Sequence, residues 1–247
     1  MGSRRLPGKV LAQVCGKSLL EHQMERMMRA RGLEEIVIAT TSSSADDAIE
    51  TVARSRGWAL YRGSEDDVLG RYAEAAAVFE ADAVARMTMD CPLIDPTIID
   101  QVIEAYQVGS YDFVANNLER SFPHGLDLEV FSRETLDITD REATEAFDRE
   151  HVSPFVRAHP YRFRLTNVRS SRDLGHYRWT VDYVEDLELV RSVYNVLYRE
   201  GQFFSTDDVL GLLERCPEIA RMNAPKIWDG GEPSFLGGGG AAESEAG

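Results

Sequence analysis

The sequence predicts an α/β protein in which short buried strands alternate with amphipathic helices around an open sheet. Three observations support this fold class. Short apolar runs recur between stretches with helical periodicity, as in strand–helix units. Two of these runs end abruptly in a carboxylate, at Asp90 and at Asp182. The chain has 247 residues, 43% of them hydrophobic, which is enough to bury one sizeable core.

The composition excludes several classes of protein. A formal net charge of −15 disfavours a DNA or RNA partner, because phosphate backbones need a clustered basic surface. Cys15, Cys91 and Cys216 are widely separated, which suggests neither a zinc site nor a disulfide framework. We find no apolar run of about 18 residues and no signal-peptide pattern, so we expect a cytoplasmic protein without a membrane partner.

The opening segment, Met1–Lys9 (MGSRRLPGK), is a basic loop that can wrap an anion. Backbone N–H groups of Gly2 and Ser3 could line a concavity, and the arginines and Lys9 could bind phosphate. A frayed basic terminus is the alternative. An amphipathic helix is expected next, at Lys17–Arg31.

Strand and helix patterns then alternate along the chain. Glu35–Thr40 is a β-branched strand, and Ser44 with Asp47 predicts a capping box, with Asp46 and Asp47 complementing the helix dipole. The further expected elements are a strand at Ala59–Arg62, helices at Val68–Phe79 and Thr97–Tyr106, a strand at Asp112–Asn117, a charged helical stretch at Glu134–Arg157, an edge-like strand at Arg162–Val168, and helices at Leu187–Tyr198 and Thr206–Leu213.

The stretch Ala83–Asp95 (AVARMTMDCPLID) reads as a buried strand that stops at Asp90, with Pro96 opening the next helix. Ligands of open α/β sheets bind at the carboxyl ends of strands, although Asp90 could equally cap a turn. Tyr177–Asp186 repeats the pattern, with a strand expected to end at Asp182. Two strand-end carboxylates and a basic loop suit Mg²⁺-assisted chemistry on a nucleoside triphosphate, with a generic nucleotide or sugar binder as the alternative.

A Pro-His-Gly turn at His124 leads into an alternating strand that ends at Phe131. Its polar face carries Asp127 and Glu129, and Asp127 follows the turn closely enough to be a candidate for gripping substrate. His151 has no Ser or Cys arrangement near it that predicts a nucleophilic triad. The Gly-rich segment at 229–247 is expected to be a disordered tail.

Seven motifs, in order, resemble the cytidylyltransferases that activate acidic sugars, such as the CMP-Kdo and CMP-acylneuraminate synthetases. The nearest resemblance is to the branch of spore coat polysaccharide biosynthesis protein F. The motifs are GSRRLPGK, EIVIATT, RGSEDDVLGRY, DCPLID, HGLDLEVF, REHVSPFVR and HYRWTVDYVEDL. Together they span residues 1 to roughly 225.

This resemblance implies a Rossmann-like nucleotidyltransferase fold, a three-layer α/β/α domain over residues 1–225 with a mostly parallel sheet and a small β insertion at about 120–155. It further implies transfer of CMP from CTP to a sugar, with release of pyrophosphate, for surface polysaccharide or glycan biosynthesis. A homodimer formed through the region around Leu126–Pro154 is also expected.

Site residues carry over motif by motif. The catalytic set is Arg5, Lys9, Asp90 and Asp182, of which Asp90 and Asp182 would coordinate Mg²⁺. The nucleotide would contact Gly2, Ser3, Arg5, Lys9, Thr40, Thr41, Ser42, Gly63, Ser64, Arg71 and Asp90. The sugar would face His124, Asp127 and Arg178.

The chain departs from the family pattern at several points. It begins inside the first motif, so we expect the central sheet to lack its first strand, with the start placed at an internal methionine. Met89 stands where glycine is expected and could crowd the nucleotide, while His124 and Tyr183 could alter sugar choice. Three alternatives remain: a transferase using another nucleotide or nucleotide sugar, an inactive nucleotide-binding remnant, and a structural α/β domain.

Overall fold

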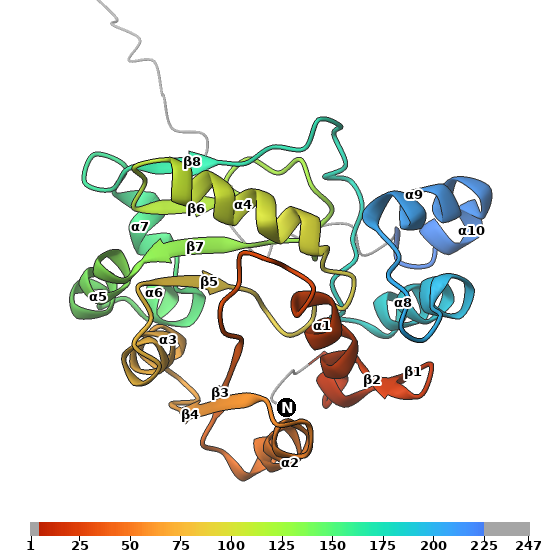
Figure 1. The fold of residues 1–247 in the computed structure, drawn as a ribbon, viewed down its shortest axis with the longest axis horizontal. Coiled ribbons are helices and arrows are strands. Elements are labelled where there is room, and N and C mark those ends of the chain that lie inside the picture. The colour runs from red at the N-terminus through yellow and green to blue at the C-terminus, as the bar shows by residue number, and fades with distance from the viewer. Residues whose placement is uncertain (1–4, 225–247) are drawn as a thin grey trace, which may run out of the picture.

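The computed structural model describes residues 5–224 and confirms the α/β fold class (Figure 1). Gly2, Ser3 and the Gly-rich tail at 229–247 lie outside the described residues. Among residues 5–224, no helix combines the length and the apolar character needed to cross a bilayer.

Within residues 5–224, the strands form three separate sheets. A short antiparallel hairpin joins β1 (Gln13–Val14) to β2 (Lys17–Ser18), and β3 (Val37–Thr41) pairs in parallel with β4 (Ala59–Gly63). The largest sheet has the order β5-β7-β6-β8, formed by Ala83–Arg86, Glu129–Ser132, Phe113–Ala115 and Leu165–Asn167. It is mixed, because β7 runs antiparallel to β5 and β6 whereas β8 is parallel to β6.

Helices cover the sheets and connect the strands. Figure 1 shows α4 crossing β6 on the face toward the viewer, with α8, α9 and α10 grouped to the right of the sheet. The helices are α1 (Leu19–Met27), α2 (Asp47–Arg56), α3 (Val68–Val78), α4 (Pro96–Val108), α5 (Arg133–Glu142), α6 (Ala146–His151), α7 (Pro154–Ala158), α8 (Val184–Leu197), α9 (Thr206–Arg215) and α10 (Pro217–Ala220), with 3₁₀ turns η1 (Lys9–Leu11) and η2 (Ser44–Asp46).

Local sequence explains several helix boundaries. Asp95 accepts a hydrogen bond from the Thr97 N–H and Pro96 begins α4, as predicted. The charged stretch at 134–157 is three helices and not one. Ala143 adopts an extended conformation that ends α5, and Val152, at a positive φ of 72°, ends α6 before Pro154 starts α7.

The predicted capping box at Ser44 and Asp47 is wrong. The residues 44–46 form η2, and no side chain caps α2. Asp46 lies in the first turn of η2, directly before α2. It is buried, and its carboxylate accepts hydrogen bonds from the hydroxyls of Thr40 and Thr41 at 2.6 and 2.7 Å, which ties the end of β3 to the helix start.

The edges of β3 and β5 border a common cavity of about 630 Å³. Val37 and Ala39 line it from β3, and Ala83 and Ala85 line it from β5. Within residues 5–224 no ladder joins these two strands, so their facing edges carry backbone groups that a further strand could pair with.

The polar face predicted for β7 is buried where Glu129 lies. Glu129 is 2% exposed, and its carboxylate pairs with Arg86 at 2.7 Å and with Arg157, and it accepts a hydrogen bond from the Ser153 hydroxyl at 2.8 Å. Burial alone would raise the pKa of Glu129, but the two guanidinium groups lower it to about 2. The charge therefore links β5, β7 and α7 inside the fold.

We predict that Glu129→Gln lowers the free energy of unfolding at pH 7 by ~3 kcal/mol, because removing one partner of a buried ion pair leaves the other charges uncompensated. Urea denaturation measures the change. Glu142→Gln is the matched control, since Glu142 pairs with Arg162 at the surface, where an ion pair contributes little to stability, and should destabilise the protein much less than Glu129→Gln. Equal losses in the two variants would contradict a structural role for the Glu129 cluster.

Candidate active site at the carboxyl end of β5

The side chain of Lys9 lies between two carboxylates. Gly8, in the left-handed region at φ 72°, turns the chain into η1 so that Lys9 points inward. Its Nζ donates to Asp90 Oδ2 and to Asp182 Oδ1, each at 2.8 Å. Arg5 lies beside this pair, with Nη2 3.6 Å from Asp182 Oδ1 and Nη1 donating to the Tyr183 hydroxyl at 3.2 Å. Four residues predicted as catalytic thus meet at one point.

Asp90 lies in a turn four residues beyond the end of β5. From α1, Gln23 donates to the Thr88 carbonyl at 2.7 Å and accepts from the Cys91 N–H at 3.1 Å. The hydroxyl of Tyr194 in α8 donates to the Pro92 carbonyl at 2.6 Å. Side chains from α1 and α8 therefore hold the backbone of this turn in place.

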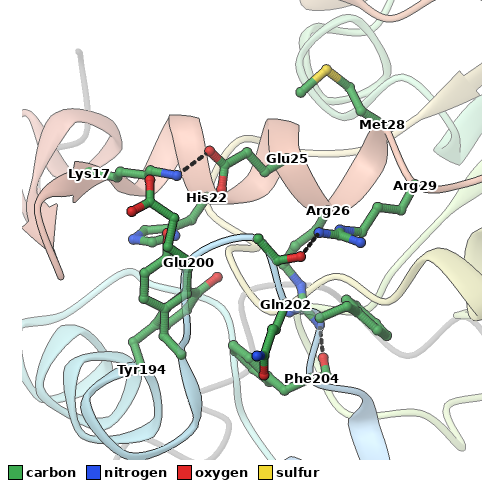
Figure 2. Close-up of a pocket in the computed structure, with 13 residues that line it drawn as sticks. Lys17, His22, Glu25, Arg26, Met28, Arg29, Tyr194, Glu200, Gln202 and Phe204 are labelled. Atoms are coloured by element: carbon green, nitrogen blue, oxygen red, sulfur yellow. Dashed lines mark hydrogen bonds and ion pairs between the residues drawn. The ribbon is translucent and has the colours of Figure 1, made fainter.

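Arg26 extends this grip, with Nε donating to the Ile94 carbonyl at 2.6 Å and Nη2 to the Phe204 carbonyl at 3.1 Å. Figure 2 shows Arg26 descending from α1 toward Phe204, in the wall of a cavity of about 420 Å³. None of the predicted site residues lines this cavity. It lies behind the Asp90 turn and is separate from the carboxylate pair.

The predicted strand ending at Asp182 is wrong. The segment 177–182 bends at Thr180 and at Asp182, and its β pairing within residues 5–224 is an isolated bridge between Arg178 and His124. It is held instead by buried Trp179 and by contacts to the other carboxylate segment: the Val181 N–H donates to the Asp90 carbonyl at 2.8 Å. The backbones that carry Asp90 and Asp182 are thus bonded directly to each other.

The charges at this point stabilise one another. Burial would raise the pKa of Asp182, but Lys9 and Arg178 lower it to about 2. Burial also works against the charge of Lys9, yet Asp90 and Asp182 raise its pKa overall. The pKa of Asp90 is lowered in the same way, because Lys9 and the Thr88 hydroxyl outweigh its burial. All three groups are therefore charged at neutral pH.

The donor set fits a divalent cation such as Mg²⁺. One oxygen of each carboxylate faces the Lys9 ammonium, so a cation already bridges the pair in this structure. The other oxygens are held by scaffold groups, namely the Thr88 hydroxyl on Asp90 at 2.6 Å and Arg178 on Asp182 at 2.7 Å. Residues 5–224 contain no group of three or more His, Cys, Asp or Glu side chains that could hold a metal, and Mg²⁺ commonly uses two carboxylates with phosphate oxygens and water.

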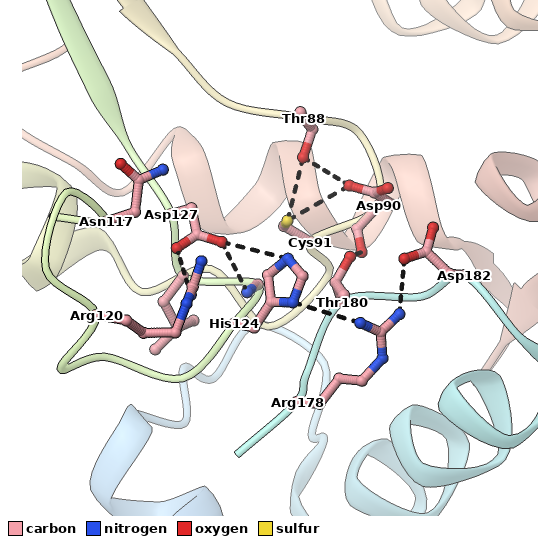
Figure 3. A network of polar contacts seen from close by, with 12 residues as sticks. Thr88, Asp90, Cys91, Asn117, Arg120, His124, Asp127, Arg178, Thr180 and Asp182 are labelled. Atoms are coloured by element: carbon pink, nitrogen blue, oxygen red, sulfur yellow. Dashed lines mark hydrogen bonds and ion pairs between the residues drawn. The ribbon is translucent and has the colours of Figure 1, made fainter. Parts of the chain in front are cut away.

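The residues predicted to face the sugar lie together beside Asp90 (Figure 3). Asp127 pairs with Arg120 at 2.9 Å, and His124 Nε2 is 3.7 Å from the second oxygen of Asp127. Burial lowers the pKa of His124. Gly125 has a positive φ of 108°, and the chain approaches Thr180 closely here. A Cβ at this position would lie 2.5 Å from the Thr180 backbone nitrogen, so glycine is needed.

The nucleotide-binding residues predicted at the ends of β3 and β4 lie next to each other. The Ser42 N–H donates to the Gly63 carbonyl at 2.8 Å, and Arg71 donates to the Ser64 carbonyl at 2.5 Å. In the part of the chain that the structure describes, no hydrogen bond links this pair of loops, which also carries Thr40 and Thr41, to Lys9 or to either carboxylate. They are therefore not part of the hydrogen-bonded charged centre.

Sequence analysis missed two residues that shape the site. Thr88, two positions before Asp90, fixes that carboxylate. Asp186, which directly precedes the helix expected at Leu187–Tyr198, accepts hydrogen bonds from the Asp182 N–H at 2.9 Å and from Arg178. The four-residue spacing from Asp182 to Asp186 was the one available signal, because it places Asp186 within the first turn of a following helix.

Comparisons with known proteins give matches over most of the chain. A family model described as cytidylyltransferase matches residues 1–203. Spore coat polysaccharide biosynthesis protein SpsF of Bacillus subtilis is 31% identical, over 89% of this chain and 93% of that protein. A 3-deoxy-manno-octulosonate cytidylyltransferase of Geobacter sulfurreducens is 39% identical over 41% of this chain and 40% of that protein. The structure of a cytidylyltransferase from Leptospira borgpetersenii aligns with a TM-score of 0.85 and 32% identity, covering 89% of this chain and 92% of that one.

We predict that Lys9→Met destabilises the protein at pH 7 by ~3 kcal/mol, because it leaves Asp90 and Asp182 facing each other without a shared cation. The loss of stability caused by Lys9→Met should become smaller as the pH falls below about 4, because carboxylates without a neighbouring cation become protonated there. Thermal unfolding across this pH range measures the loss of stability and its dependence on pH, and repeating it with Mn²⁺ measures the effect of a metal.

Mn²⁺ should stabilise Lys9→Met more than the parent, since the metal can take the place of the ammonium. The control is Lys17→Met, which removes a lysine that pairs with Glu25 away from the site. An equal response to Mn²⁺ in parent and Lys9→Met would mean that Lys9 does not occupy the cation position.

Proposed function

The chain belongs to the cytidylyltransferase family, and on that basis we propose that it transfers CMP from CTP to a sugar acid or a related sugar. The reaction would release pyrophosphate and serve surface polysaccharide or glycan biosynthesis. The observation that carries the proposal is the convergence of Asp90 and Asp182 on Lys9, within 2.8 Å each. Such a centre suits the transfer of a highly charged phosphoryl group.

Asp90 and Asp182 would hold Mg²⁺, which when bound would neutralise phosphate charge and stabilise charge in the transition state. Lys9 would exchange its carboxylate contacts for a phosphate oxygen, and the half-exposed Arg5 would bind the triphosphate from the outer side. The sugar hydroxyl oxygen would bond to the α-phosphorus as the bond to the departing pyrophosphate breaks. No protein nucleophile is needed, because positioning and electrostatics supply the catalysis.

The other predicted site residues would bind the base, the ribose and the sugar. Thr40, Thr41, Ser42, Gly63, Ser64 and Arg71 are proposed to contact the base and ribose, together with Gly2 and Ser3 from the phosphate loop. His124 and Asp127 are proposed to face the sugar, and Arg178 was assigned there by motif. Met89 packs against the core cluster of Leu20, Met24 and Ile38, which supports an uncrowded nucleotide site.

A cytoplasmic location fits a CTP-dependent reaction, and a homodimer built through the region 126–154 is proposed from the family resemblance. The alternative functions are a transferase that uses another nucleotide or nucleotide sugar, and an inactive protein that binds nucleotide without turnover. The assay below separates them.

We predict pyrophosphate release when the protein is incubated with CTP, Mg²⁺ and a panel of sugar acids, and weaker release with UTP. Asp90→Asn and Asp182→Asn should each lower turnover by ~100-fold or more, on the scale of losing one electrostatic contact to a charged transition state. Asp112→Asn, which removes a carboxylate paired with Arg164 away from the site, should leave turnover unchanged.

CTP binding without product, measured by calorimetry, would favour the inactive alternative. Turnover with a nucleotide sugar but not with CTP would favour the other transferase. If both aspartate variants bound nucleotide in the presence of Mg²⁺ as the parent does, the proposed metal site would be wrong.

A further inference from the structure

Asp182 is held by a different set of groups on each side. Its Oδ1 faces Lys9, whereas its Oδ2 accepts from Arg178 Nη2 at 2.7 Å. Its backbone N–H donates to Asp186 Oδ2 at 2.9 Å. Both the carboxylate and the backbone of Asp182 therefore rest on groups that lie behind it, away from Lys9.

Asp186 is the centre of this support. Its side chain is fully buried and accepts hydrogen bonds from Arg178 Nε and Nη2, each at 3.1 Å, and from the N–H groups of Asp182 and Tyr183 at 2.9 and 3.0 Å. The Asn223 amide adds a further bond at 2.8 Å. A buried carboxylate with this many donors is compensated, so it can act as a rigid anchor.

Asn223 closes the anchor from a distant part of the chain. It follows α10 and is 3% exposed, and its Nδ2 donates both to Asp186 Oδ1 and to the Arg178 carbonyl, each at 2.8 Å. One amide therefore fixes the backbone of Arg178 and the carboxylate that holds its guanidinium. The segment after α10 therefore helps to hold Arg178 and Asp186 in position.

This geometry leaves Arg178 little freedom to bind a sugar. Its side chain is 9% exposed, Nε and Nη2 are taken by Asp186 and Asp182, and Nη1 is 3.4 Å from His124 Nδ1. Burial would lower the pKa of Arg178, but Asp186 and Asp182 raise it, so the guanidinium stays charged as a structural cation. Figure 3 shows it turned toward Asp182.

We propose that Arg178, Asp186 and Asn223, here called the Asp186 lock, are positioning residues that aim Asp182 at the cation position. The lock acts through Asp182 and touches no substrate. It rests on the proposed function in one respect, the assignment of Asp182 as a metal ligand. Removing a member should weaken metal binding, because groups that orient a ligand commonly contribute 10–100-fold to affinity.

The test measures Mn²⁺ binding to the full chain by electron paramagnetic resonance, without nucleotide or sugar. Asp186→Asn should weaken Mn²⁺ affinity by ~10-fold or more. Asn223→Ala leaves every charge in place but removes the donor to the Asp186 carboxylate and to the Arg178 carbonyl, and it should weaken Mn²⁺ affinity by roughly threefold or more. The matched controls are Glu188→Gln and Asn195→Ala, an exposed carboxylate and an exposed amide on α8, and both should bind Mn²⁺ like the parent.

A second readout separates positioning from sugar binding. In turnover assays, Asn223→Ala should raise the metal concentration needed for half-maximal rate and leave the KM for the sugar unchanged. A raised sugar KM with unchanged Mn²⁺ affinity would overturn the proposal in favour of a substrate role for Arg178. Unchanged Mn²⁺ affinity in a folded Asn223→Ala would also overturn it, and this variant decides the matter if Asp186→Asn does not fold.

Failure of the proposed function leaves a different pattern. If the parent and all variants lack turnover while Mn²⁺ affinity still falls in the two lock variants and not in the controls, the lock stands and the assigned reaction fails. If the parent turns over CTP but the lock variants bind Mn²⁺ normally, only the lock fails.

Discussion

Lys9 holds its ammonium 2.8 Å from Asp90 and 2.8 Å from Asp182, and much of the surrounding structure serves to keep these three charges together. Two carboxylates aimed at one point repel each other unless a cation lies between them. In this structure the cation belongs to the N-terminal loop. In the function proposed above, a divalent metal would supply the positive charge that Lys9 supplies here.

Asp90 and Asp182 are held in position by different kinds of interaction. The Asp90 turn is gripped through its backbone by Gln23 and Tyr194, with Thr88 fixing the carboxylate locally. Asp182 lies on a segment without a ladder, so its position depends on buried charge, supplied by Arg178 and Asp186. The bond from the Val181 N–H to the Asp90 carbonyl then keeps the two segments in register.

Buried ion pairs join elements at two places where strand pairing alone does not hold them together. Glu129, with Arg86 and Arg157, joins the antiparallel strand β7 to β5 and α7, much as Asp186 joins the Asp182 segment to α8. Neither set of contacts was predicted from the sequence, which placed Glu129 only on the polar face of its strand. A pattern of alternating polar residues identifies a face of a strand, but whether water or a helix covers that face depends on elements far away in the chain.

The sequence by itself determined the α/β fold class, the family, and most of the helices and strands, because periodicity, capping residues and ordered motifs are local properties of the chain. It also singled out Lys9, Asp90 and Asp182. Tertiary structure alone decided that Lys9 bridges the two aspartates, that Arg178 is bound by Asp186, and that Asn223 lies beneath the site. These contacts join residues up to 173 positions apart, as Lys9 and Asp182 are, and their geometry depends on packing between elements that no local pattern encodes.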